Sequence, residues 1–143
     1  LARAVGREGT VYAIDVDRDL LSYVREQARS SDLNNIVTIA AGGDDPSLPA
    51  EGVDLIFTCN TYHHLPDHIR YFSNAGNYLR PGGRVAIVEL SDTSWFQNFI
   101  GHCSSRDVII TEMENAGFHL EADFGFLEKQ HFLIFGTPPT ENR

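Results

Sequence analysis

The sequence predicts an α/β fold whose doubly wound, mostly parallel sheet ends in an antiparallel pair of strands. Short apolar segments typical of strands alternate with segments of helical periodicity between Thr10 and Leu90. Such alternation is typical of a parallel sheet with helices on both faces. Near the C-terminus, Phe118–Phe126 and His131–Phe135 are strand-like segments joined by a polar turn, which favours antiparallel pairing.

The first elements follow from apolar patterning and from capping residues. Thr10–Val16 is an apolar strand with an acidic residue near its end. The helix predicted at Arg18–Arg29 places its apolar side chains on one face, and Asp17 is positioned to cap it. Asn35–Ala40 is a short β-branched strand. The glycine- and proline-rich composition of Gly42–Pro49 predicts a loop.

The middle of the chain contains two buried strands and one helix. Val53–Cys59 is a continuous apolar segment, as expected for a central parallel strand covered on both faces. Pro66 can sit in the first turn of the next helix, which carries apolar residues on one side as far as Leu79. The Arg80–Gly83 segment stops this helix, because proline and glycine break helices. Arg84–Leu90 is the next buried strand.

The last third of the chain begins with an aromatic segment, Ser94–Gly101. Ser104 or Ser105 is positioned to cap a helix that Gly117 ends. The antiparallel strands follow. Residues 137–143 include two consecutive prolines and predict a frayed tail.

Length, charge and cysteine content limit the possible functions. We expect residues 1–143 to form a single domain, because this length suits one hydrophobic core. The net charge is −9, and no cluster of Lys or Arg occurs, so nucleic acid is not an expected partner. No apolar run is long enough to cross a membrane. Cys59 and Cys103 lack CxxC spacing. Cys59 lies in an apolar strand, which favours a buried, reduced thiol there and a cytoplasmic location.

Acidic residues follow the first two predicted strands. Ligands of doubly wound sheets bind at the carboxyl ends of the strands. Asp15 lies where a carboxylate can accept hydrogen bonds from ribose hydroxyls. The alternative is that Asp15 caps the following helix or is simply solvated. Asp17 is better placed for capping than Asp15. Asp44 and Asp45 follow the second strand and favour recognition of an exocyclic amine. The sequence Asp45-Pro46 also fits an ordinary turn.

A polar segment with three histidines, His63, His64 and His68, follows the third strand. A structural zinc site needs four ligands in tight geometry, so we expect no metal here. We expect Tyr62 and His63 to line a substrate pocket, and His63 is the candidate catalytic base because histidine titrates near neutral pH. His64 is expected to pack or to bond the backbone.

Three aromatic residues follow the strand that ends at Leu90: Trp95, Phe96 and Phe99. Because they come after a strand end in a loop, they are candidates for an apolar lid that lines the substrate pocket. Packing in the core is the alternative.

Five stretches, in order, resemble the class I S-adenosylmethionine-dependent methyltransferases of the small-molecule type. They are Val11–Asp17, Gly43–Pro49, Val53–Leu65, Leu79–Val88 and Glu112–Phe118. They are distributed along most of the chain, from Val11 to Phe118. Each motif is weak by itself, and the ordered set is specific.

The resemblance implies a Rossmann-like fold and methyl transfer from S-adenosylmethionine to a small molecule, with S-adenosylhomocysteine as product. It implies that Asp15 holds the cofactor ribose and that Val16 touches the adenine. It further implies that Asp44 bonds the adenine amine, that Asp45 supplies a backbone contact beside it, and that Asn60 lies near the methionyl end.

Two other functions fit parts of the sequence. A nucleotide-binding oxidoreductase of the Rossmann type explains the acidic strand end equally well, but explains the segment after Cys59 less well. A non-catalytic methyltransferase remnant is the other alternative, because the family's first strand and glycine-rich loop are not found within residues 1–143.

The expected domain is therefore incomplete at its N-terminus. In the family, the absent strand lies between the strands that here end at Asp15 and Cys59. Its absence leaves ladder groups of both neighbours unpaired, and each buried unpaired group costs about 1–3 kcal/mol. We expect residues 1–143 alone not to form a stable monomeric domain and to bind no cofactor.

Overall fold

The computed structural model describes residues 1–91 and 104–138, and it divides into two compact units, Leu1–Leu48 and Pro49–Arg143. The expectation of a single domain stays a prediction.

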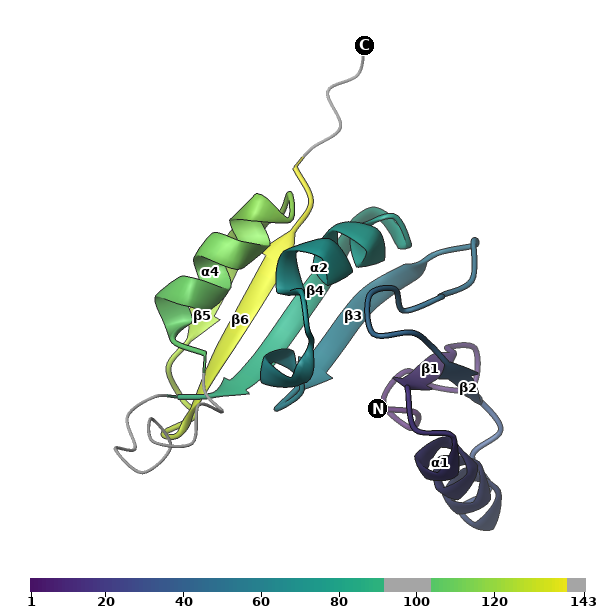
Figure 1. Ribbon diagram of the computed structural model, residues 1–143. Coiled ribbons are helices and arrows are strands. Elements are labelled where there is room, and N and C mark those ends of the chain that lie inside the picture. Colours follow the sequence, from purple (N-terminus) through teal and green to yellow (C-terminus); the bar gives the residue numbers. More distant parts are fainter. Residues whose placement is uncertain (92–103, 139–143) are drawn as a thin grey trace. The chain divides into compact units, whose positions relative to one another are not determined.

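The first unit is a β-α-β element (Figure 1). Strands β1 (Val11–Asp15) and β2 (Ile36–Ala40) pair in parallel, from Val11 opposite Ile36 to Asp15 opposite Ala40. Between them runs α1 (Arg18–Ser30), capped by the Asp17 carboxylate, which accepts hydrogen bonds from the Asp19 and Leu20 amides. The predicted strand, cap, helix and strand are confirmed here.

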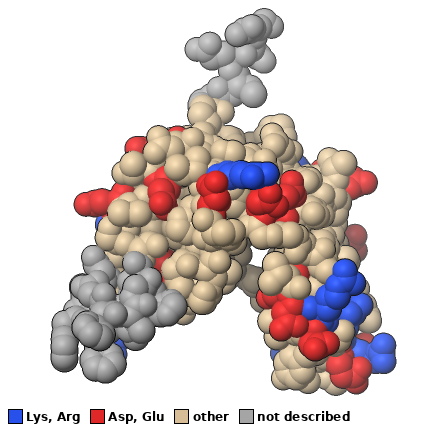
Figure 2. Space-filling view, viewed as in Figure 1, with Lys and Arg blue, Asp and Glu red and all other residues tan. Residues whose placement is uncertain are grey.

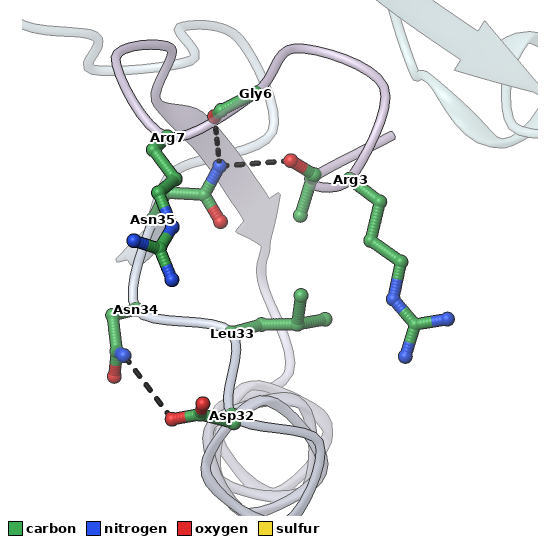
Figure 3. Close-up of a pocket in the computed structure, with 8 residues that line it drawn as sticks. Arg3, Gly6, Arg7, Asp32, Leu33, Asn34 and Asn35 are labelled. Atoms are coloured by element: carbon green, nitrogen blue, oxygen red, sulfur yellow. Dashed lines mark hydrogen bonds between the residues drawn. The ribbon is translucent and has the colours of Figure 1, made fainter.

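The chain before β1 is fastened to the start of β2 by Asn35. Its Nδ2 lies 2.8, 2.9 and 3.0 Å from the carbonyl oxygens of Ala2, Gly6 and Gly9. A surface pocket of about 530 Å³ lies beside this contact, and Arg3 and Arg7 extend along it on either side of Leu33 (Figure 3). The pocket is at the amino ends of the strands, away from the carboxyl end where Asp15 stands.

The second unit is a four-stranded sheet with the order β3-β4-β6-β5. Its strands are β3 (Val53–Cys59), β4 (Leu79–Leu90), β5 (His119–Phe124) and β6 (Gln130–Gly136). Strands β3 and β4 are parallel, whereas β6 is antiparallel to both β4 and β5. The predicted antiparallel C-terminal pair is confirmed.

Three helical elements accompany this sheet: the 3-10 helix η1 (Tyr62–His64), α2 (His68–Gly76) and α4 (Arg106–Asn115). Ser105 caps α4, as one of the two predicted serines, and Gly117 follows it with a φ of +94°. Helices α2 and α4 lie on the same face of the sheet (Figure 1). Their contact with the sheet builds a core of ten buried residues: Tyr62, Phe72, Ala75, Val85, Ile87, Ile109, Met113, Phe118, Leu133 and Phe135.

Two predicted boundaries of the α2 region are wrong. Pro66 lies outside α2, because Asp67 takes the capping position and accepts a hydrogen bond from the Arg70 amide. Leu79 belongs to β4 and not to the helix, because it pairs with Val53. The Arg80–Gly83 turn then forms an irregularity within β4 and does not end a helix.

The prediction that β3 is buried on both faces is also wrong. Leu55 and Phe57 are 53% and 42% exposed, and Cys59 is an exposed free cysteine. These residues alternate along β3 and so share one face. In the second unit as described, α2 and α4 cover the opposite face, where Ile56 packs against the core.

On the face shown in Figure 2, acidic side chains lie beside the basic ones over the described residues. One ion pair of the second unit joins Arg80 Nη1 to Asp54 Oδ2, 2.8 Å apart. Among the residues that the structure describes, no helix is long and apolar enough to cross a membrane.

Substitution of Met113 by Ala tests the core between α4 and the sheet. Met113 is fully buried, so we expect the free energy of unfolding to fall by about 2–5 kcal/mol. Val108→Ala on the same helix is the matched control, because Val108 is 46% exposed. Urea unfolding measures both. Equal losses in the two variants would contradict this assignment of the buried face.

Candidate functional site

The acidic residues of the first unit lie together at the carboxyl edge of its parallel strands. Asp15 ends β1 opposite Ala40, the last residue of β2, and the Ala41 amide donates to the Asp15 carbonyl at 3.1 Å. The turn containing Asp44 and Asp45 follows directly. The structure therefore brings these two predicted groups to one edge, as expected from parallel pairing.

The Asp15 carboxylate is only partly used by the fold. Its Oδ1 accepts a hydrogen bond from the Asp17 amide at 2.9 Å, which holds the turn between β1 and α1. Its Oδ2 has no hydrogen-bond partner within residues 1–91 and 104–138. Asp15 is half-buried, and the next residue, Val16, is 67% exposed. Asp15 Oδ2 and the apolar side chain of Val16 are therefore accessible to a ligand at the end of β1.

The turn after β2 has a structural role for one of its two acids. Asp45 Oδ1 accepts the Ser47 amide at 2.6 Å, and Asp45 also forms an isolated antiparallel bridge with Gly42. The turn interpretation of Asp45-Pro46 is therefore observed. Asp44 is half-buried in the same turn.

In the second unit, Asn60 follows β3 with a φ of +51°. Its amide donates to the Val88 carbonyl at 2.8 Å, and its Oδ1 accepts a hydrogen bond from Gln130 Nε2 at 2.9 Å. Asn60 is exposed at the carboxyl end of β3. A left-handed backbone is uncommon outside glycine, and asparagine tolerates it better than most residues.

Tyr62 is completely buried in the core of this unit. Its hydroxyl donates to Glu112 Oε2 at 2.6 Å, and its ring stacks on His68 with centroids 4.1 Å apart. Burial, followed by the bond to Glu112, raises the pKa of the Tyr62 phenol, so the hydroxyl keeps its proton. This side chain belongs to the core, and its role in lining a substrate pocket stays a prediction.

His63 pairs with an acid that the sequence analysis did not single out. Its Nδ1 lies 2.8 Å from Glu89 Oε1, and the two side chains are 10% and 0% exposed. Glu89 is the acidic residue inside the otherwise apolar end of β4. In the sequence, Glu89 could be recognised only as an acidic residue within an apolar strand segment.

The three histidines do not converge on one point. His68 Nδ1 lies 2.8 Å from Glu112 Oε2, whereas His63 pairs with Glu89. The His64 ring lies 4.1 Å from that of His63, but His64 is exposed. Within the described part of the chain, no group of three or more His, Cys, Asp or Glu is arranged to hold a metal ion.

The other predicted lining residues, Trp95, Phe96 and Phe99, lie outside the described residues.

Comparison with known proteins gives one consistent result. The family described as a methyltransferase domain matches residues 1–87. The arsenite methyltransferase of Halobacterium salinarum is 31% identical over 97 residues, which cover 66% of this chain and 24% of that protein. The demethylmenaquinone methyltransferase of Geobacillus kaustophilus is 25% identical over 96 residues, which cover 67% of this chain and 41% of that protein. The chain thus spans less than half the length of these curated relatives.

The fold is shared with a solved structure, an S-adenosylmethionine-dependent methyltransferase from Aquifex aeolicus. The TM-score is 0.84 at 22% identity, over 94% of this chain and 72% of that one. This likeness confirms the predicted Rossmann-like α/β fold.

We predict that the protein holds no stoichiometric metal, because His63 and His68 are each paired with a different carboxylate. Elemental analysis for zinc and iron after mild dialysis measures this. One equivalent of metal that is lost in a His63→Ala/His68→Ala double variant would contradict the prediction.

Proposed function

The chain belongs to the methyltransferase domain family, and on that premise we propose that the protein transfers a methyl group from S-adenosylmethionine to a small molecule. S-adenosylhomocysteine is the expected product. The observation that carries the proposal is the carboxyl edge of the first unit, where Asp15 Oδ2 is available beside the turn after β2. The family match does not favour the oxidoreductase alternative.

The residues at this edge fit an adenosine group. A ribose presents two hydroxyl donors, and Asp15 Oδ2 is an acceptor without a partner in the described structure. Val16 offers apolar contact for adenine, and Asp44 is the acceptor for its amine, with the Asp45 backbone beside it. In the second unit, Asn60 is the residue proposed for the methionyl end. The bound cofactor supplies the electrophilic methyl on its sulfonium; the protein supplies alignment and exclusion of water.

We propose His63 as the base for an acceptor that must lose a proton. A carboxylate that is ionised only accepts hydrogen bonds, so the 2.8 Å contact with Glu89 is a hydrogen bond when His63 carries its proton on Nδ1, and we assign that tautomer to the base. The neutral ring then has Nε2 as its basic nitrogen, which accepts a proton from the substrate. A buried carboxylate partner also stabilises the cation that forms.

A small-molecule acceptor, without nucleic acid, and a cytoplasmic location belong to the same proposal. The net charge of −9 supports the exclusion of nucleic acid, because phosphate binding needs clustered Lys and Arg. The free thiol of Cys59 is consistent with a reducing compartment. Tyr62, Trp95, Phe96 and Phe99 stay candidate lining residues, as His63 does.

Asp15→Ala in the complete protein tests the adenosine site. Loss of hydrogen bonds to a charged acceptor costs about 1.5–3 kcal/mol, so we expect S-adenosylhomocysteine to bind weaker by that amount. Isothermal titration measures it. Asp19→Ala is the matched control, because Asp19 is an exposed acid in the first turn of α1. Wild-type affinity in a folded Asp15→Ala variant would remove Asp15 from the site.

His63→Ala tests the base. We expect kcat to fall by about 10²–10⁴-fold, the usual contribution of general base catalysis, with cofactor affinity unchanged. The assay is release of S-adenosylhomocysteine in a screen of acceptors that includes arsenite and demethylmenaquinone, as named for the relatives. His64→Ala is the control, since His64 is the exposed neighbour. A His63→Ala variant as active as the His64→Ala control would exclude His63 as the base.

A further inference from the structure

Glu89 is a fully buried carboxylate whose hydrogen bonds all fall on one oxygen. Oε1 lies 2.8 Å from His63 Nδ1 and accepts the Leu90 amide at 2.9 Å. Oε2 is buried and has no partner in the described residues. A buried acceptor atom of a charged group that lacks a hydrogen bond is destabilising, even where the group's other oxygen is satisfied. Something is therefore expected to complete this side of the carboxylate.

The residue opposite Glu89 on the neighbouring strand is His131. The two form a direct pair in the antiparallel β4–β6 ladder, so their side chains lie on the same face with Cβ atoms about 4.5–5.5 Å apart. His131 Nε2 is itself buried and lacks a partner among residues 1–91 and 104–138. Two unsatisfied polar atoms thus belong to directly opposed residues.

A third unsatisfied atom lies on this face. Thr58 pairs with Ile87 across β3 and β4, and Ile87 is two residues before Glu89. Side chains two apart along a strand point the same way, so Thr58 and Glu89 share a face. Thr58 Oγ1 is also buried without a partner in the described structure. Three of the four such atoms found there therefore belong to side chains on one face of the sheet.

We propose that His131 is a positioning residue for the candidate base: its Nε2–H holds the second oxygen of Glu89, directly or through one buried water. The chemistry of the two groups is complementary, since the carboxylate only accepts and the neutral imidazole donates from one nitrogen. With both oxygens held, the carboxylate cannot turn. The His63 ring is then fixed with its proton on Nδ1. The effect of His131 on catalysis rests on the proposed function. The contact between His131 and Glu89 does not.

The consequence for catalysis is one of orientation. At metal sites, removal of a partner that fixes the ring and tautomer of a ligating histidine lowers metal affinity or activity by about 10–100-fold, and we expect the same scale for the candidate base. We therefore expect His131→Phe, which keeps a ring but removes Nε2, to lower kcat by that factor and to leave KM nearly unchanged.

The test uses the complete protein with ¹⁵N-labelled histidine, and long-range ¹H–¹⁵N NMR at neutral pH reads the tautomer of each ring. In the wild type, we expect His63 to carry its proton on Nδ1 and His131 to carry its proton on Nε2. In His131→Phe, His63 is expected to become a mixture of tautomers. His131→Gln restores the single tautomer, because its side-chain amide donates in place of Nε2–H.

The matched control is His119→Phe. His119 is a half-exposed histidine of the same sheet, paired with Gly136 at the other end of the β6 ladder from His131. We expect this variant to leave the His63 spectrum and kcat unchanged. A thermal melt of each variant checks that it is folded.

The wild-type spectrum decides the geometry even if a variant fails to fold. A proton on Nδ1 of His131, or the imidazolium or Nε2–H form of His63, overturns the inference. An unchanged His63 spectrum in folded His131→Phe also overturns it. If both tautomers are as expected but no acceptor is methylated, the inference holds and the proposed function fails. If methylation occurs and kcat of folded His131→Phe equals the wild-type value, the inference alone fails.

Discussion

The contact between the buried carboxylate of Glu89 and His63 is the interaction on which the role proposed for His63 depends. Glu89 lies on β4, a strand paired on both edges, with β3 on one side and β6 on the other. Strand β3 brings the segment with His63, and β6 brings His131. A charge placed at this point inside an apolar face is tolerated only if the neighbouring strands supply partners. The sheet order therefore decides which histidines meet the carboxylate.

Local order in this chain could be predicted from sequence because its causes are local. The Asp17 carboxylate satisfies the amides two and three residues later, and Gly117 ends α4 in a left-handed conformation. Strand β3 has the predicted bounds, Val53–Cys59. The edge formed by Asp15 and the turn after β2 could also be predicted, since parallel neighbours place their carboxyl ends together.

The rest depends on contacts between residues far apart in sequence. Leu79 belongs to a strand and not to a helix because it pairs with Val53. The residues near Leu79 in the sequence do not indicate that pairing. Glu89 lies 26 residues from His63, so their contact follows only from the register of β3 with β4. Cys59 was expected to be buried from its apolar neighbours, yet exposure depends on which face the helices cover. Periodicity identifies an apolar strand but does not say whether each face has a covering layer.

The second unit contains two histidine–carboxylate pairs, His63–Glu89 and His68–Glu112, and the two pairs differ in how exposed they are to solvent. Glu112 Oε2 receives both the Tyr62 hydroxyl and His68 Nδ1, and it thereby joins η1 and α2 to α4. Its side chain and that of His68 are 27% and 20% exposed, so water reaches this pair and screens it. At Glu89 the carboxylate is wholly buried, and its partner His63 is 10% exposed. Tyr62 and His63 are adjacent, so one short helix is fixed by Glu112 at the first residue and by Glu89 at the second. The more exposed pair fastens the helix to the core, and the buried pair orients the ring that the helix presents at the end of β3.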